Sequence, residues 1–380
     1  MFSRRRVRQA GLWAMVILGA WLAANGGERK PDVHYVPTPQ EVVDAMLQTA
    51  GVGRDDIVYD LGCGDGRLVI TAIEKFGAKK GVGIDIDPER IRDSSANARK
   101  ANLTDRATFL EQDLYETEFS EATVVTLYLL PKLNVRLRPM LFRQLRPGDR
   151  IVSHAFDMEE WEADKTIQVP GEDQQERTVY YWVLPGGAAG AWKWTLPGAK
   201  GEQCQLRLRQ RFQAVSGTVK IDGQEQPIAD AKLAGDRLTF AIVREAGKDK
   251  AKMLFSGRII GNTLVGTVET EGGPAAGKHE WTATRDRVNL VGTWGWKMGE
   301  QPATLRIERR DGRLYGALST AEKAQVRLAH FYAWGNGIYF IHEGGTRQTF
   351  EGIVEGEGIA GTVTPAGGEA KEWAAQRTKK

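Results

Sequence analysis

A glycine-rich segment, DLGCGDG at residues 60–66, constrains the fold of this chain more than any other feature. It follows the β-branched run IVY and precedes the helical run RLVITAIEKF, so it marks a turn between a strand and a helix. Gly62, Gly64 and Gly66 allow backbone conformations that other residues avoid, and they leave room for a ligand to approach the backbone. A unit of this kind is typical of a parallel α/β domain and predicts a ligand site at the turn.

The same alternation of short β-branched runs and helical stretches continues over residues 31–185. It predicts βαβ units, and two closely spaced runs at its end predict a terminal antiparallel hairpin. We therefore expect one α/β, doubly wound, Rossmann-like domain built on a seven-stranded sheet. The expected strands are DIVYDL (56–61), GVGIDI (81–86), ATFLEQ (107–112), TVVTLYL (123–129), RIVSHAF (150–156), KTIQV (165–169) and TVYYWVL (178–184).

The second half of the chain has a different pattern. After PGGAAG at residues 185–190, short alternating strands punctuated by glycine replace the helical periodicity. An internal repeat divides this region, because AWKWTL resembles TWGWKM and the later segments WTATR and WAAQR also correspond. We predict two all-β modules, residues 190–287 and 291–378, each an up-and-down meander closed into a small barrel or into two facing sheets.

Several residue types are too sparse or too dispersed to build other kinds of site. Cys63 and Cys204 fall in different predicted domains, and the five histidines lack metal-ligand spacing, so we expect neither a disulfide nor a metal site. The formal net charge is only +3, which argues against a nucleic-acid partner. The sequence does not identify a ligand for the β-rich region. Its clustered tryptophans are expected to form barrel cores: Trp192, Trp194, Trp294 and Trp296.

Acidic residues follow the next two predicted strands. Asp85 comes about 20 residues after the glycine turn, where a carboxylate can accept both hydroxyls of a ribose. Asp113 follows the third strand and can accept from an adenine amino group, while Leu114 supplies backbone. A nicotinamide dinucleotide uses the same strand-end acid, but its glycines are spaced GxGxxG. Here the spacing is GxGxG, and Asp60 at the end of the first strand suits a cationic ligand, which favours S-adenosylmethionine.

Four segments together resemble the class I, or seven-stranded, S-adenosylmethionine-dependent methyltransferases. Within that superfamily, YVPT and LYLLP make the chain similar to the ATP synthase c subunit lysine N-methyltransferase family. The resemblance covers less than half of the chain, and the eukaryotic members of that family lack a duplicated β-rich half. The four segments are YVPTP (35–39), DLGCGDGRLVI (60–70), GVGIDIDPERI (81–91) and ATVVTLYLLPKLNVRLRP (122–139).

The resemblance implies which residues meet the cofactor and the methyl acceptor. The segment from Tyr35 to Thr38 would fold over the donor pocket, and Tyr35, Tyr128 and Pro131 are candidates for lining the methyl site. A buried core aromatic is the alternative interpretation of Tyr128, because VVTLYLL is apolar on both faces. No catalytic group is identified, since methyl transfer from a sulfonium mainly requires alignment and exclusion of water. Cofactor binding is implied for Thr38, Asp60, Gly62, Cys63, Gly64, Gly66, Asp85, Ile86, Asp113 and Leu114.

Three hypotheses about function follow. The first is a methyltransferase (EC 2.1.1.-) whose acceptor is a protein lysine, as the resemblance implies. The second is a small-molecule methyltransferase, which differs only in its acceptor. The third is an exported binding protein with a degenerate cofactor domain and ligand-binding β modules, although intact Gly62, Gly64, Asp85 and Asp113 argue against such decay. Oligomeric state is not predicted.

The first residues resemble a targeting segment. Residues 1–27 combine the basic run SRRRVR with an apolar run from Ala10 to Ala24, which is shorter than the ~20 residues of a membrane span. We therefore favour a signal peptide over a membrane anchor. Either would place the rest of the chain outside the cytoplasm or at the membrane, which conflicts with a cofactor that is made in the cytoplasm.

Overall fold

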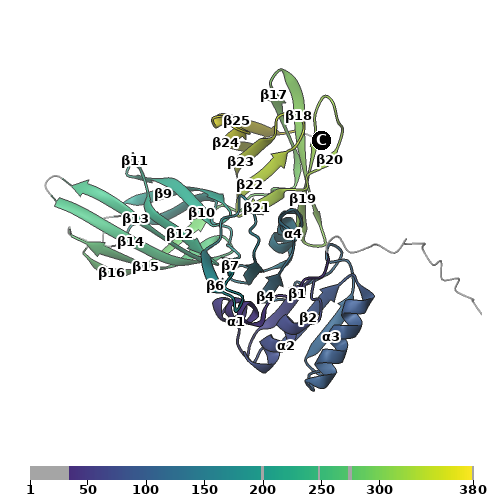
Figure 1. The fold of residues 1–380 in the computed structure, drawn as a ribbon. Helices are drawn as coiled ribbons and strands as arrows, with labels where there is room; N and C mark the ends of the chain where they lie inside the picture. The colour runs from purple at the N-terminus through teal and green to yellow at the C-terminus, as the bar shows by residue number, and fades with distance from the viewer. Residues whose placement is uncertain (1–33, 198–200, 247–248, 273–275, 379–380) are drawn as a thin grey trace, which may run out of the picture.

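A mixed seven-stranded sheet, with strand order β3-β2-β1-β4-β5-β7-β6, forms the centre of the first half of the chain (Figure 1). The computed structural model describes residues 34–197, 201–246, 249–272 and 276–378, so the predicted targeting segment 1–27 lies outside the described residues. The predicted terminal hairpin is confirmed, because β7 pairs antiparallel with both β5 and β6. The elements are α1 (Gln40–Thr49), β1 (Ile57–Leu61), α2 (Arg67–Glu74), β2 (Lys80–Asp85), α3 (Pro88–Lys100), β3 (Ala107–Glu111), β4 (Val124–Leu127), α4 (Pro131–Gln144), β5 (Arg150–His154), β6 (Lys165–Pro170) and β7 (Glu176–Val183).

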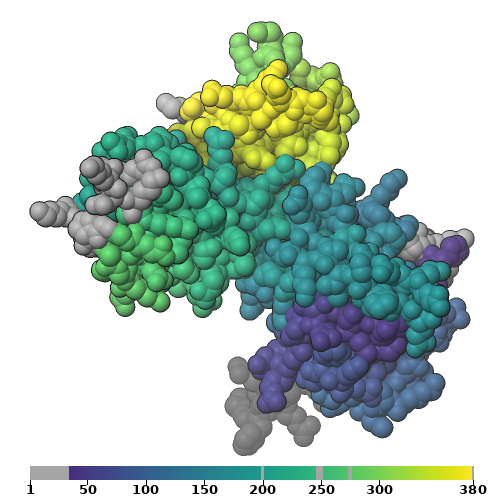
Figure 2. Space-filling view, turned by 60° about the vertical axis from the view of Figure 1, so that its left-hand side comes forward, coloured from purple at the N-terminus to yellow at the C-terminus, as the bar shows by residue number. Residues whose placement is uncertain are grey.

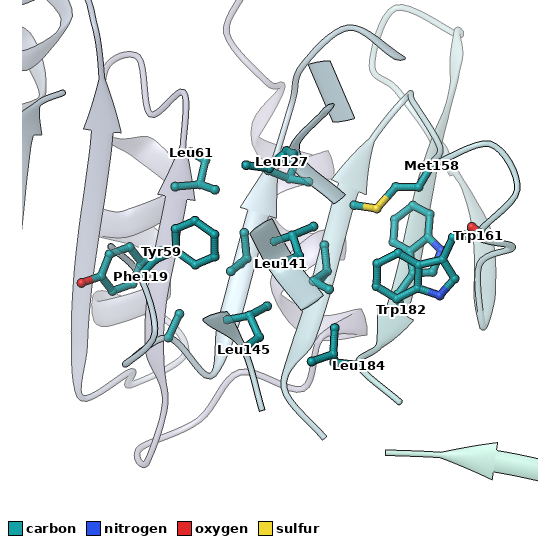
Figure 3. Packing of buried hydrophobic residues seen from close by; sticks show 14 of the residues in the cluster. Tyr59, Leu61, Phe119, Leu127, Leu141, Leu145, Met158, Trp161, Trp182 and Leu184 are labelled. Atoms are coloured by element: carbon teal, nitrogen blue, oxygen red, sulfur yellow. The ribbon is translucent and has the colours of Figure 1, made fainter. Parts of the chain in front are cut away.

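The two faces of this sheet are covered differently. Neighbouring residues of a strand face opposite sides, so Val58 packs with α1 and α2 while Tyr59 packs on the side of α4. Figure 3 shows Leu141 of α4, and Leu145 directly after this helix, against that second face. The same hydrophobic cluster also contains side chains from the second half of the chain, including Phe212. The β-rich half therefore completes the core over the face that α4 covers only in part.

The β-rich half consists of two repeated modules. Each is a nine-stranded antiparallel sheet, and the strand orders, β11-β10-β9-β8-β16-β15-β14-β13-β12 and β20-β19-β18-β17-β25-β24-β23-β22-β21, have the same connectivity. The first module contains β8 (Gly190–Thr195), β9 (Gln203–Arg211), β10 (Ala214–Ile221), β11 (Gln224–Pro227), β12 (Ala229–Ala234), β13 (Arg237–Ala246), β14 (Asp249–Ile260), β15 (Thr263–Glu271) and β16 (Gly277–Arg285). The second contains β17 (Gly292–Met298), β18 (Gln301–Arg310), β19 (Arg313–Ser319), β20 (Val326–Arg327), β21 (Phe331–Trp334), β22 (Gly337–His342), β23 (Gln348–Glu355), β24 (Gly358–Pro365) and β25 (Lys371–Arg377).

The sheet of each module curls so that its two edge strands, which are consecutive in the sequence, are connected by a short stretch of chain. Ile228 is the only residue between the edge strands β11 and β12, and its amide donates to the carbonyl of Gly217 on β10 at 3.1 Å. Leu328 in the second module makes the matching bond to Gly316 at 2.9 Å. The prediction of two repeated meander or small-barrel modules is therefore confirmed: one sheet comes near to a closed barrel, and the other is a curled half-barrel. Continuous chain at the seam limits the exposed strand edges.

Aromatic side chains fill both modules. The tryptophans predicted to form the cores do so: Trp192, Trp194 and Trp294 are buried, and the half-buried Trp296 packs against the same core. An arginine covers the end of each module. Arg285 stacks 4.4 Å from the Trp192 ring centroid, and Arg377 stacks 4.1 Å from that of Trp294. The interiors of both modules are therefore packed cores to which these tryptophans contribute.

The three parts of the chain share one aromatic junction, and Figure 2 shows them as lobes that meet there. The ring of Phe142 on α4 lies 4.6 Å from Trp161 in the first domain, 5.7 Å from Phe212 in the first module and 5.2 Å from Tyr332 in the second. The connecting segment PGGAAG is largely buried here, and Gln210 accepts from the amide of Ala188 at 2.7 Å. The modules are thus packed onto the first domain rather than loosely tethered.

Two further observations concern the cysteines and possible membrane-spanning helices. The free cysteines Cys63 and Cys204 are both buried. Across residues 34–378, apart from the three short gaps in the description, no helix has the length and apolar character needed to cross a membrane.

Candidate cofactor and acceptor site

The glycine turn lies at the carboxyl end of β1, where it is fastened to β2. The amides of Gly62 and Cys63 both donate to the carbonyl of Ile84 on β2, at 2.8 and 2.9 Å. Gly62, Gly64 and Gly66 have φ angles of +92°, +52° and +79°, a region that favours glycine. A Cβ atom on Gly66 would also approach the Phe109 ring to 2.7 Å. The turn therefore requires glycine for its conformation and for its packing.

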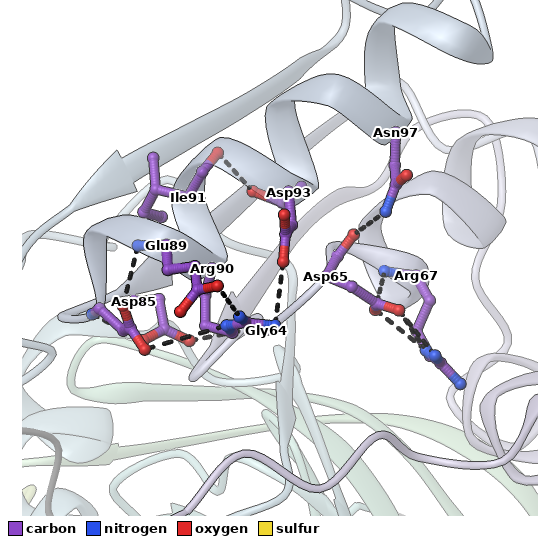
Figure 4. Close-up of polar contacts among 11 residues, drawn as sticks. Gly64, Asp65, Arg67, Asp85, Glu89, Arg90, Ile91, Asp93 and Asn97 are labelled. Atoms are coloured by element: carbon purple, nitrogen blue, oxygen red, sulfur yellow. Dashed lines mark hydrogen bonds and ion pairs between the residues drawn. The ribbon is translucent and has the colours of Figure 1, made fainter.

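Asp85 ends β2 and presents its carboxylate to the glycine turn (Figure 4). Its Oδ2 accepts from the amide of Gly64 at 3.0 Å, and its Oδ1 accepts from the amide of Asp87 at 3.0 Å. These bonds fix the orientation of the carboxylate and leave each oxygen able to accept from a further donor. Two neighbouring hydroxyls of a ribose are a donor pair of that kind.

Asp60 lies on β1 directly before the turn and is 2% exposed. The hydroxyl of Thr126 donates to its Oδ1 at 2.6 Å. Burial raises the pKa of Asp60 to about 7; the Thr126 hydrogen bond opposes this, and the nearby carboxylates of Asp85 and Asp65 add to it. A cation beside Asp60 would favour the ionised carboxylate. This end of the site therefore suits a positively charged ligand.

A third carboxylate, Asp113, follows β3, and its Oδ1 accepts from the amide of Tyr115 at 2.9 Å. It opens with the other two onto one cavity of about 1020 Å³, measured with its open mouth. Gly64, Gly66 and Pro131 lie outside the lining, since the two glycines build the turn and Pro131 begins α4. The predicted residues that line the cavity are Tyr35, Thr38, Asp60, Gly62, Cys63, Asp85, Ile86, Asp113, Leu114 and Tyr128.

Residues 35–38, here called the cover segment, lie across the glycine turn. A Cβ atom on Gly64 would come within 2.2 Å of Tyr35 Cε2, so the tyrosine ring rests directly on this glycine. The Arg90 guanidinium stacks 4.9 Å from the ring centroid, and Arg67 donates to the last carbonyl of the segment at 2.8 Å. The two arginines were missed in the sequence, where nothing but their nearness to the glycine turn and to Asp85 distinguishes them.

One wall of the cavity is formed by the aromatic ring of Tyr128. Tyr128 follows β4, is half-buried and lines the cavity, so its place differs from that of a core aromatic within the strand. Its ring packs 4.0 Å from the ring of His154, which ends β5, and 6.2 Å from that of Phe156. The sequence carried no signal for His154, because a histidine in an apolar strand is most often a core residue.

The residue set fits a nucleoside ligand that carries a positive charge. Acidic groups lie at the end of β2 and after β3, a buried acid lies near the end of β1, and the turn that follows β1 has glycine at alternate positions. Within the described ranges, no three His, Cys, Asp or Glu side chains are grouped to hold a metal ion. S-adenosylmethionine has a ribose, an adenine and a sulfonium, which together match these features.

Comparisons with known proteins agree with this geometry. The ANTKMT methyltransferase domain family matches residues 60–165. A protein-lysine N-methyltransferase of Saccharolobus islandicus (strain REY15A) is 48% identical over 154 residues, which are 40% of this chain and 95% of that protein. The chain belongs to this methyltransferase family. Little of that relative is left to correspond to the β-rich half, so the family resemblance concerns the first domain.

Two further similarities concern the same methyltransferase domain. The human lysine N-methyltransferase named for the c subunit of ATP synthase is 29% identical over 139 residues, 36% of this chain and 57% of that protein, so the chain spans little more than half of that relative. A solved RNA methyltransferase of Salinibacter ruber in complex with S-adenosylhomocysteine is 51% identical, covers 39% of this chain and 93% of that chain, and has a TM-score of 0.37. S-adenosylmethionine is the cofactor of this domain, and the chain is an S-adenosylmethionine-dependent methyltransferase.

Proposed function

We propose that this chain transfers a methyl group from S-adenosylmethionine to the side-chain amine of a protein lysine. The observation that carries the proposal is the match to nearly the whole length, 95%, of a protein-lysine N-methyltransferase at 48% identity. The human relative, named for methylation of a lysine in the c subunit of ATP synthase, supports the same acceptor chemistry.

Within this proposal, three carboxylates hold the cofactor. Asp85 accepts from the ribose hydroxyls, because hydrogen bonds from Gly64 and Asp87 already hold its two oxygens toward the cavity. Asp113 accepts from the adenine amino group. Asp60 would face the ammonium group of the amino-acid part, where positive charge favours ionisation of the Asp60 carboxylate. Each role rests on the place of its residue in the cavity lining.

Methyl transfer requires the protein mainly to align the acceptor amine with the methyl group and to exclude water from the site. Bound S-adenosylmethionine supplies an electrophilic methyl group on a positively charged sulfur. The aromatic wall at Tyr128, together with Leu129 and Leu133 in the same lining, excludes water from the acceptor side. Desolvation there lowers the pKa of an incoming lysine amine, so the neutral nucleophile becomes accessible near neutral pH. The ring of Tyr128 restricts the direction from which this amine can approach.

The acceptor class can be tested with labelled cofactor. Purified full-length chain would be incubated with methyl-labelled S-adenosylmethionine and, separately, with dialysed cell lysate protein, a small-molecule extract and total RNA. We expect label in protein, recovered as methyl-lysine after acid hydrolysis. Asp85→Asn should abolish it, whereas the control Asp105→Asn, whose exposed carboxylate lies in the turn before β3 and away from the cavity lining, should not. Label confined to small molecules or RNA would refute the lysine proposal.

We also propose that residues 1–27 direct the chain to export or to the membrane, on the strength of their basic and apolar sequence pattern. Fractionation of cells that express the full chain, or a chain lacking these residues, tests this. We expect the full chain outside the cytoplasm or with membranes, and the truncated chain in the soluble cytoplasmic fraction. Identical cytoplasmic distribution of both would refute the proposal.

A further inference from the structure

One buried histidine behind the cavity joins two of its walls. His154, at the end of β5, is 3% exposed. Its ring packs against the Tyr128 ring, with centroids 4.0 Å apart and planes inclined by 31°. On another side, its Nδ1 and the hydroxyl of Thr38 share a hydrogen bond at 3.4 Å. His154 thus contacts both the aromatic wall and the last residue of the cover segment.

The surroundings of His154 hold it in place. Phe156 continues the ring stack, with its centroid 6.2 Å from that of Tyr128. The carbonyl of Phe156 accepts from the Ser153 hydroxyl at 2.7 Å and from the Asn134 amide at 3.2 Å. The chain therefore leaves β5 in a fixed turn, and the position of the imidazole does not depend on its own contacts alone.

The charge state of His154 excludes one possible role. Burial, and after it the positive charge of Arg177 on β7, lowers its pKa to about 4. Tyr128 and Thr38 face it from other elements, the first with its ring and the second with its hydroxyl. The imidazole is therefore a weak base, and it lies behind the cavity rather than in its lining, where it is not placed to contact an incoming amine. General-base catalysis is not its function.

We infer that His154 is a positioning residue for methyl transfer: its ring supports Tyr128 on the acceptor wall, and its nitrogen holds Thr38 of the cover segment over the cofactor. This inference rests on the proposed function, since it assigns the acceptor to the side of Tyr128. The two contacts use different parts of one side chain. They can therefore be removed separately.

Two substitutions divide the contacts. His154→Phe keeps a flat ring beside Tyr128 but loses the hydrogen bond to Thr38. His154→Asn keeps a group that can bond to Thr38 but loses the ring. We expect His154→Phe to raise the KM for S-adenosylmethionine several-fold with little change in kcat, and His154→Asn to lower kcat about tenfold with little change in that KM. A residue with a merely structural role would not produce this reciprocal split.

Thr38→Val removes the same hydrogen bond from the other partner. We expect it to match His154→Phe, and the double variant Thr38→Val, His154→Phe to be no worse than either single variant, because both remove one interaction. His330→Phe is the matched control: this half-buried histidine also contacts a tyrosine hydroxyl, that of Tyr332 at 3.4 Å, but lies in the second module. It should leave both kinetic constants unchanged.

The outcomes separate this inference from the proposed function. Additive effects of Thr38→Val and His154→Phe, or equal changes of kcat and KM in both His154 variants, would overturn the positioning role. If the His154 variants do not fold, Thr38→Val alone must still raise the KM, or the cover-segment contact is refuted. If the unmodified chain binds S-adenosylmethionine but methylates no protein lysine, the proposed function fails, while calorimetric affinities of the variants still test the Thr38 contact.

Discussion

A buried ion pair where the first domain meets the second module gives a quantitative prediction. Arg138 on α4 is fully buried, its Nη1 donates to Glu160 Oε2 at 2.9 Å, and its Nε donates to the Tyr332 hydroxyl at 2.9 Å. Arg347 of the second module pairs with the other oxygen of Glu160. Glu160→Gln would leave the charge of Arg138 buried beside a neutral amide, which costs about 3–5 kcal/mol in a fully buried pair.

The pKa of Glu160 gives a second, independent value for the free-energy cost of losing this ion pair. Desolvation opposes ionisation, but the hydrogen bonds from Arg138 and Arg347 outweigh it and lower this pKa from 4.5 to about 2. That lowering corresponds to about 3 kcal/mol in favour of the carboxylate. The Glu160 side chain is 19% exposed, so solvent screening reduces the effect. We therefore expect Glu160→Gln to lower the free energy of unfolding by about 2–3 kcal/mol.

Urea denaturation, followed by circular dichroism and by tryptophan fluorescence, measures this change. Glu343→Gln is the control, because Glu343 lies 3.4 Å from the same Arg347 but is 61% exposed, and its loss should cost less than about 1 kcal/mol. Because the pKa of Glu160 is lowered, its contribution to stability is fully present above pH 4.5 and is lost as the pH falls toward 2. The unfolding free energies of the unmodified chain and of Glu160→Gln should therefore converge in acid. Equal losses for both variants would refute the reasoning about burial.

Three further predictions concern the cofactor site. Affinity for S-adenosylmethionine should rise up to about tenfold from pH 6 to pH 8, as Asp60 with its pKa near 7 becomes ionised, and calorimetry should find no such dependence in Asp60→Asn. Gly64→Ala should weaken binding at least about tenfold, because its Cβ would displace the Tyr35 ring, whereas Gly77→Ala, at a similar φ of +74° but with open space around it, should not. Cys63, buried and with its pKa raised by that burial, should resist iodoacetamide at pH 7 unless the chain is unfolded.

The sequence predicted the first domain well because its signals are local. All seven strands lie within a few residues of the expected runs, since each is a β-branched segment bounded by turn residues. The carboxylates Asp85 and Asp113 could be assigned because parallel strands bring their carboxyl ends to one edge. Regular alternation and tryptophan spacing were likewise enough to predict two repeated barrel-like modules.

Long-range packing could not be predicted in the same way. The short strand β11, with the polar sequence QEQP, has no hydrophobic alternation, so the seam of the first module was missed. The burial of PGGAAG depends on Gln210, a side chain on a distant strand that satisfies its backbone. The contact of His154 with Thr38 joins residues 116 positions apart, and no periodic pattern reports such a pair.

Calorimetric titration of the chain with S-adenosylmethionine, S-adenosylhomocysteine and NAD tests the central claim most directly, with Asp85→Asn and the control Asp105→Asn alongside. The arrangement of Asp60, Asp85 and Asp113 around a GxGxG turn predicts that both adenosyl ligands bind and NAD does not. It also predicts that Asp85→Asn loses this binding while Asp105→Asn retains it. Absence of binding by either adenosyl ligand, or equal binding by Asp85→Asn, would contradict the assignment of this cavity as the methyl-donor site.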